Sequence, residues 1–185
     1  MLELETEVRR ATTADAQALS GLSATLFPLG CPANTKPEDL AEYIRRELTT
    51  ERFRAFLEDH RHVILAASVS NKLAGYAFIA RVSAPPHMQL SAGLELRKFY
   101  IDAAYHGRGV ANALMKEVLA IAANEREGAL WLSVFSGNER AISFYKKWGF
   151  RIAGTQDFVV GADCQQDYLM QRGPATNTKD NQQCK

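Results

Sequence analysis

The segment from Leu94 to Phe135 most constrains what this chain can fold into, because its hydrophobic period changes twice. LELRKFYID alternates apolar and polar residues at its start and predicts a strand, whereas GVANALMKEVLAIAANEREG has the spacing of a helix. ALWLSVF then returns to a near-continuous apolar run, typical of a strand buried on both faces. A strand, a helix and a strand in this order form a right-handed crossover between parallel neighbours. We therefore expect an α/β fold whose chemistry lies where strands lead into helices.

The rest of the sequence adds strands and helices on both sides of this crossover. Before it, the pattern predicts a strand to about Arg10, a helix that begins after Thr12 or Thr13, one helix or two over residues 38–58, and an antiparallel hairpin that turns at Ser70-Asn71-Lys72. After it, the pattern predicts a short helix with Ser136 and Glu139 as a capping box and Gly149 as its stop, then strands near residues 151–156 and 167–172. This order indicates a mixed sheet.

Composition and charge exclude several classes of protein. The 185 residues are 46% hydrophobic, which suffices for the core of one globular domain. Twenty-two Lys and Arg against 21 Asp and Glu leave a formal net charge of +1, so no global field would recruit nucleic acid or a membrane surface. Cys31, Cys164 and Cys184 are too widely spaced for a disulfide framework or a zinc motif. No apolar run approaches the roughly 20 residues of a membrane span, and we expect a cytoplasmic protein.

Two glycines stand where the first strand of the crossover leads into its helix, in the stretch YHGRGVANAL. Gly107 and Gly109 lack the Cβ that would keep a phosphate from the backbone, and glycine adopts the positive φ that aligns successive N–H groups. The helix dipole behind them also favours an anion. A turn and a helix cap are the competing interpretation. The stretch is neither a P-loop nor a dinucleotide-binding fingerprint, because no Gly-Lys-Ser/Thr ends it and Asn112 replaces the third glycine.

A second motif follows one helix and one strand later, and the pair resembles the signatures of the GNAT acyltransferase superfamily. The first signature, Arg/Gln-x-x-Gly-x-Gly/Ala, corresponds to His106, Gly107, Arg108, Gly109, Val110 and Ala111. The second, Asn-x-x-Ala-x-x-Phe-Tyr-x-x-x-Gly-Phe, corresponds to Asn138, Ala141, Phe144, Tyr145, Gly149 and Phe150. Their order and separation also match.

The resemblance extends over roughly residues 8–172 and implies a GNAT fold, with a mixed central sheet of about seven strands flanked by helices on both faces. It implies a single acetyltransferase domain over residues 1–172, followed by a polar, disordered tail over 173–185. Within the superfamily the chain is most similar to the PaiA-type spermidine/spermine acetyltransferases, through the stretches LELRKFYI, LWLSVF, AISFYKKWGF and DYLM.

The resemblance also implies how a co-substrate is held. Acetyl-CoA would be bound without any metal, its pantetheine arm pairing like an added strand with the backbone of one strand and its pyrophosphate resting on the glycine loop. The implied binding residues are Phe99, Tyr100, Ile101, His106, Gly107, Arg108, Gly109, Val110, Ala111, Asn112, Asn138 and Tyr145. His106 departs from the usual Arg or Gln, so its charge at neutral pH is in question.

Asn138 and Tyr145 are the candidate site residues of the second motif. They are two helical turns apart and so share one helix face, which by the resemblance lines the cofactor channel. The resemblance gives Asn138 a hydrogen bond to pantetheine. A tyrosine hydroxyl can donate the proton that lets the CoA thiolate leave, which makes Tyr145 the expected general acid. A core aromatic side chain is the alternative for Tyr145.

A base is also expected, because an amine acceptor is mostly protonated at neutral pH. Some superfamily members carry a glutamate five residues before the motif asparagine, but this sequence has Ser133 there. Glu95 is the alternative base, since burial among apolar neighbours would raise its pKa. A salt bridge from Glu95 to Arg97 or Lys98 on a solvated face is an equally good interpretation.

The acceptor is expected to be a small-molecule primary amine, acetylated by direct attack within a ternary complex. Acidic residues between Phe27 and Asp59 would attract a polyamine, although they alternate with arginines as solvated helix faces do. The alternatives are a protein N-terminal or lysine acetyltransferase and a non-catalytic acyl-CoA-binding module. We expect no nucleic acid or membrane partner, and a homodimer is one assembly open to such a chain.

Overall fold

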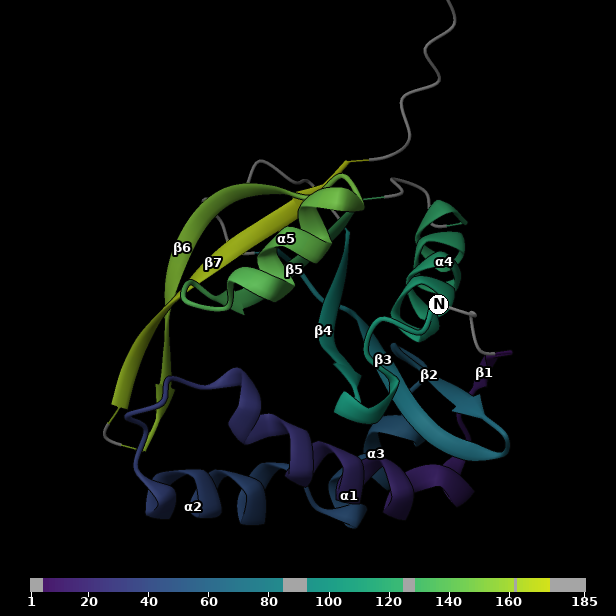
Figure 1. The fold of residues 1–185 in the computed structure, drawn as a ribbon, viewed down its shortest axis with the longest axis horizontal. Coiled ribbons are helices and arrows are strands. Elements are labelled where there is room, and N and C mark those ends of the chain that lie inside the picture. The colour runs from purple at the N-terminus through teal and green to yellow at the C-terminus, as the bar shows by residue number, and fades with distance from the viewer. Residues whose placement is uncertain (1–4, 85–92, 125–128, 162, 174–185) are drawn as a thin grey trace, which may run out of the picture.

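The computed structural model describes residues 5–84, 93–124, 129–161 and 163–173, and Figure 1 shows its fold. One mixed sheet has the strand order β1-β2-β3-β4-β5-β7-β6. Its strands are β1 (Glu7–Arg10), β2 (His62–Val69), β3 (Lys72–Arg81), β4 (Leu94–Ile101), β5 (Leu130–Phe135), β6 (Arg151–Val160) and β7 (Asp163–Arg172). The expected α/β fold with about seven strands is confirmed. Most of the expected tail, residues 174–185, lies outside the described residues.

Among the described strands, only β4 and β5 pair in parallel, and α4 (Val110–Ala123) lies between them in the chain. The other neighbouring strands are antiparallel. The β2–β3 hairpin turns where expected, with Ser70 and Asn71 at positive φ. The crossover that the sequence predicted is therefore present and carries the glycine loop at its first corner.

Helices cover both faces of the sheet. On one face α4 and α5 (Glu139–Lys147) bury Leu114, Val118 and Ile142 against the strands. On the other face α1 (Ala16–Leu26) and α3 (Thr50–Glu58) bury Leu19 and Phe53 in a second core. Figure 1 shows α2 (Pro37–Glu47) beside α1, below the long β6–β7 hairpin. Fully burying one such large apolar side chain contributes about 1.5–3 kcal/mol, so both layers are firmly attached.

Three element boundaries differ from the sequence prediction or refine it. Residues 38–58 hold two helices, because Leu48 leaves helical geometry and Thr49 caps the second by accepting from the N–H of Arg52. The expected capping box at Ser136 is wrong, since α5 begins two residues later with Asn138 as its cap. Strands β6 and β7 are also longer than predicted: each has ten residues, and the two pair as one antiparallel hairpin.

A bulge interrupts β4. Phe78 of β3 lies opposite Lys98, but the next residue, Ile79, lies opposite Leu96, so Arg97 has no partner in the register. The bulge explains why apolar and polar residues do not alternate regularly in this part of the sequence. Before it the even-numbered residues of β4 face α4, and after it the odd-numbered residues do. As a result Arg97 and Lys98 both extend toward the face that α1 and α3 cover.

Strands β4 and β5 separate soon after they meet. Their register contains only Leu94 opposite Leu130 and Glu95 opposite Trp131, although both strands continue beyond these pairs. The later part of β4 therefore offers backbone groups to no neighbour on that side, and Figure 1 shows the gap between the two strands widening toward the glycine loop end of β4.

Candidate active site

The glycine loop joins β4 to α4 with the geometry expected of an anion cradle. Gly107 and Gly109 have φ values of 72° and 90°, a region that costs other residues about 1–2 kcal/mol. Gly109 is the N-cap of α4, and its carbonyl accepts from the N–H of Ala113. Within the described residues no hydrogen bond occupies the N–H groups of Gly107, Gly109, Val110, Ala111 and Asn112. Five donors at a positive helix end thus remain available.

His106 fastens the start of this loop. Its Nε2 lies 2.9 Å from the carbonyl oxygen of Ile101, and because a carbonyl only accepts, Nε2 is the protonated ring nitrogen. The side chain of Asp102 accepts from the N–H of Ala104 in the same corner. The histidine that departs from the family signature therefore holds the loop against the end of β4, a role that needs a donor and no charge.

A cavity of about 530 Å³ opens beside the cradle, between α4 and α5. Its walls combine apolar surface from Phe144 and Trp148 with the cationic side chains of Lys116 and Lys147. Gly109, Asn112, Ala113 and Thr6 complete the lining. An aromatic wall with two cations at a helix N-terminus suits a ligand that carries both a phosphate and a flat apolar group.

The later part of β4 brings the expected pairing residues to the widening gap. Phe99 and Ile101 turn their side chains into the core on the α4 side, whereas Tyr100 packs into the opposite core. Their backbone groups stay along the gap on the side away from β3. Burial raises the pKa of Tyr100 well above its usual value, so this hydroxyl stays protonated.

Tyr145 lies on the buried face of α5 and meets β4 through Phe99. The two ring centroids are 6.3 Å apart in an edge-to-face arrangement, and Phe144 and Phe150 pack against Tyr145 from either side. Tyr145 is 8% exposed, and desolvation by burial raises its pKa well above the usual 10. The structure thus brings together two of the expected residues and keeps the Tyr145 hydroxyl in its proton-donating form.

Asn138 is engaged as a helix cap. Its Oδ1 accepts from the N–H of Ala141 at 3.1 Å, and its own N–H donates to the carbonyl of Phe135 at 2.9 Å. A cap of this type contributes about 1 kcal/mol to the helix. Because Ala141 already uses one lone pair of Oδ1, the group that Asn138 offers most directly to a ligand is the Nδ2 donor.

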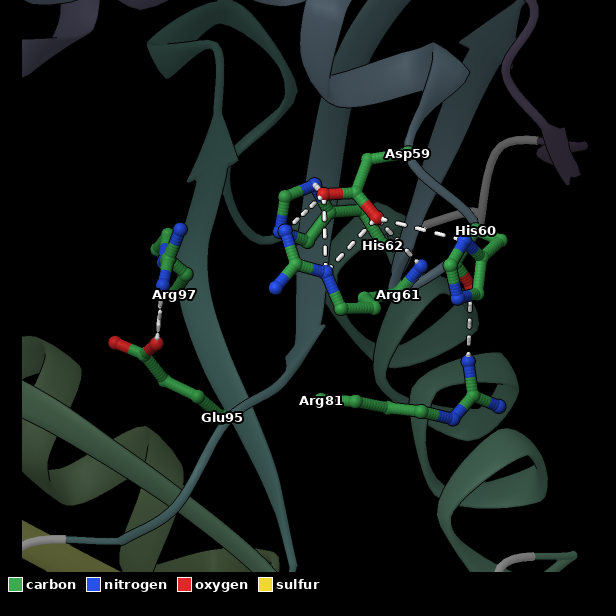
Figure 2. A network of polar contacts seen from close by, with 7 residues as sticks. All are labelled: Asp59, His60, Arg61, His62, Arg81, Glu95 and Arg97. Carbon is green, nitrogen blue, oxygen red and sulfur yellow. Dashed lines mark hydrogen bonds and ion pairs between the residues drawn. The ribbon is translucent and has the colours of Figure 1, made fainter.

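Glu95 is held by an ion pair on β4. Its Oε2 accepts from Nε of Arg97 at 3.1 Å and lies 3.0 Å from Nη2, and Figure 2 shows the pair beside the cluster formed by Asp59 and Arg61. The salt bridge that the sequence left as an alternative is therefore present. Glu95 also lies opposite Trp131, at the closed end of the gap between β4 and β5.

The position of the missing family glutamate is occupied by a polar chain that crosses three strands. Gln156 of β6 donates from Nε2 to Oγ of Ser133 on β5 at 3.0 Å, and Ser133 donates to Oδ2 of Asp167 on β7 at 2.7 Å. Sequence reasoning missed Asp167, because it stands 34 residues after Ser133 and only the antiparallel β5–β7 pairing brings them together.

Two further observations concern membrane-spanning helices and metal sites. No helix within the described ranges is long and apolar enough to span a membrane. No group of three or more His, Cys, Asp or Glu side chains that could hold a metal occurs among the residues placed by the structure.

Comparisons with known proteins relate this geometry to a family. The sequence model of the acetyltransferase (GNAT) family matches residues 31–150. An uncharacterized N-acetyltransferase of Mycobacterium tuberculosis is 40% identical over 158 residues, which cover 85% of this chain and 97% of that protein. The N-alpha-acetyltransferase RimI of the same species is 32% identical over 164 residues, or 87% of this chain and 88% of that protein. The fold is similar to that of the PaiA N-acetyltransferase from Thermoplasma acidophilum in complex with coenzyme A, with a TM-score of 0.73, 18% identity and coverage of 92% and 99%.

Proposed function

This chain belongs to the GNAT acetyltransferase family and is an acetyl-CoA-dependent N-acetyltransferase, and we propose that its acceptor is a small, polyamine-like primary amine. The reaction proceeds by direct attack of the amine on the thioester within a ternary complex. The observation that carries the use of acetyl-CoA is the glycine loop. Its five free N–H groups stand at the end of β4, which is unpaired beyond Glu95 on one side. The diphosphate of CoA fits the five donors, and its pantetheine arm fits the unpaired strand.

We assign the cofactor contacts accordingly. The backbone of Phe99, Tyr100 and Ile101 pairs with pantetheine, and Asn138 donates to one of its carbonyls. The diphosphate rests on the amides from Gly107 to Asn112. His106 acts through its hydrogen bond to Ile101, which fixes the loop. Arg108 adds positive charge beside these amides.

Tyr145 is the proposed general acid. Its raised pKa keeps the hydroxyl protonated at neutral pH, and the edge contact with Phe99 puts it beside the strand that would hold the thioester. Donation of its proton to the departing sulfur avoids a free thiolate in a dry site.

A small cationic acceptor is supported by the face of the sheet that α1 and α3 cover, which we call the acceptor side. The loop before α2 and the tip of the β6–β7 hairpin meet there, since Thr35 donates to Asp163 at 2.8 Å and the rings of Tyr43 and Phe158 lie 6.1 Å apart. These contacts narrow the space over which an extended peptide would lie. Asp163 and Asp167 on this side favour a cation, whereas Lys98 on β4 opposes it.

A protein N-terminus is the second candidate acceptor. The 32% identity to an N-alpha-acetyltransferase, over most of both chains, favours it. An α-amino group has a pKa near 8, so it needs less help in losing a proton than a polyamine does.

Thiol release from acetyl-CoA tests both candidates directly. We expect release with spermidine and spermine, less with free amino acids, and least with peptides that carry a free N-terminus. Tyr145→Phe keeps the ring packing and is expected to lower kcat by about 100-fold with acetyl-CoA affinity unchanged. Peptides acetylated faster than polyamines would replace the first candidate with the second. Binding of acetyl-CoA without release with any amine would contradict catalysis altogether and favour a binding module.

A further inference from the structure

Asp167 is a buried carboxylate that has no cationic partner among the described residues. The residue is 6% exposed, and its Oδ2 and Oδ1 accept from Ser133 at 2.7 Å and from Nε2 of Gln165 at 3.4 Å. No Lys, Arg or His of the described ranges forms an ion pair with it. Burial of an unpaired carboxylate is costly, which raises the question of what keeps it there.

Gln165 next to it has an unused acceptor. The side chain is 8% exposed, and its Oε1 is buried with no hydrogen-bond partner in the described part of the chain. The orientation of the amide is fixed, because Nε2 must face the carboxylate of Asp167. A buried acceptor without a donor is rare in folded proteins. Here the unpaired Oε1 belongs to the same amide group whose Nε2 donates to Asp167.

The carboxylate of Asp167 and Oε1 of Gln165 both lie on the acceptor side of the sheet. Ser133 is two residues past Trp131, where β5 has already left β4, and it faces away from the core that holds Leu132 and Val134. Asp167 shares that face because it bonds to Ser133. The charges of Asp167 and Asp163 contribute, after burial, to the raised pKa of Cys31 in the loop before α2.

Building on the proposed function, we infer that Asp167 binds the ammonium group of the acceptor and takes its first proton, with Oε1 of Gln165 as the second acceptor. Of the three N–H groups of the ammonium, one donates to the carboxylate and one to Gln165. The third points into the gap, and the lone pair does so once the nitrogen has lost its proton. The Gln156–Ser133 chain holds Asp167 in place, so Ser133 is a positioning residue.

Protons and electrons balance in this scheme. The ammonium passes one proton to Asp167, and the neutral nitrogen forms a C–N bond to the thioester carbon. The C–S bond then breaks, and the sulfur takes the proton of Tyr145. The amide nitrogen returns its extra proton to the Tyr145 oxygen, and Asp167 releases its proton to solvent. The sum is one amide, one CoA thiol and one proton.

Electrostatics on this face agree with the scheme. Burial raises the pKa of Asp167, while the bonds from Ser133 and Gln165 oppose the rise. Cys31, the titratable side chain in the adjacent loop that senses Asp167, has its pKa raised to about 11, first by burial and then by these charges. Cys31 thus remains neutral where Asp167 ionises.

Asp167→Asn tests the inference, because it keeps the shape and removes the charge. We expect kcat/KM for spermidine to fall by about 100-fold or more at pH 7 while KM for acetyl-CoA is unchanged, and Asp167→Glu to recover part of the loss. Calorimetric binding of spermidine to the CoA-bound protein should weaken in parallel. Asp157→Asn makes the same change at an exposed position of β6 and is expected to leave every constant unchanged.

The outcomes separate the inference from the proposed function. Acetylation that survives in Asp167→Asn with unchanged KM for the amine overturns the inference and leaves the function intact. Native protein that binds acetyl-CoA but neither binds nor acetylates any amine overturns both. If Asp167 had a merely structural role, the melting temperature of Asp167→Asn would fall. We expect this melting temperature to stay equal or to rise, because a raised pKa means that the ionised carboxylate destabilises the folded protein at pH values above that pKa.

Discussion

Replacing Lys98 by methionine is expected to stabilise the protein at neutral pH. The side chain is partly buried on the acceptor side of β4, next to the bulge. Burial, and next the charge of Arg97, lower the pKa of Lys98 from 10.5 to about 8, although Glu95 and Glu47 oppose the change. Methionine fills a similar volume without the charge.

The size and sign of the effect follow from that pKa. At about 1.4 kcal/mol for each factor of ten, the difference between 10.5 and about 8 corresponds to about 3.5 kcal/mol. The unfolded chain keeps its proton up to about pH 10.5, whereas the folded protein releases it near pH 8. The native protein therefore carries the whole burden below pH 8 and gains stability as the pH rises from 8 to 10.5.

Urea unfolding of the native protein and of Lys98→Met at pH 7 and pH 10 measures this directly. We expect the variant to gain about 3.5 kcal/mol at pH 7, or roughly 7–14 °C in melting temperature, and to lose most of that advantage at pH 10. Lys72→Met, at an exposed position of β3, controls for the general effect of the substitution and is expected to change little. An advantage that is absent at pH 7, or equal at both pH values, would refute the reasoning.

Two further predictions concern the glycine loop and the cysteines. Gly109→Val is expected to lose acetyl-CoA binding and about 1–2 kcal/mol of stability, because φ is 90° there and the new side chain enters the cradle. Gly21→Ala, in open space on α1, is the control. A calorimetric affinity of Gly109→Val for acetyl-CoA equal to the native value would contradict the assignment of the loop as the anion cradle. Iodoacetamide at pH 8 is expected to modify exposed Cys164 well before Cys31, whose pKa is raised to about 11, and site-resolved mass spectrometry showing equal rates would contradict this.

Much of the fold and of the cofactor side could be predicted because their signals are local. The strand, the two glycines and the helix are adjacent in the sequence, and both glycines have the positive φ expected of a cradle. The start of α5 was misplaced because Ser136 and Asn138 are equally good caps by type, and only the hydrogen bond from Ala141 decides between them.

The acceptor side could not be predicted in the same way, because its contacts join distant segments. Asp167 meets Ser133 through strand pairing, and no spacing rule links them. The lengths of β6 and β7 escaped detection because Gly154 and Asp157 have low strand propensity and the hairpin is half exposed. The partner of Glu95 was one of two open choices, and the structure shows that it is Arg97, which lies two residues later on the same face of β4.

The bulge at Arg97 also determines how tolerant β4 is to changes in length. A regular strand alternates its side chains, so a β4 that kept all its residues but paired without the bulge would rotate everything beyond Leu96 by half a turn. Phe99 and Ile101 would then leave the core beside α4, and Tyr100 would enter it. The extra residue thus decides which later side chains of β4 face each core, and deletion of Arg97, which removes it, should keep Phe99 and Ile101 on the α4 side.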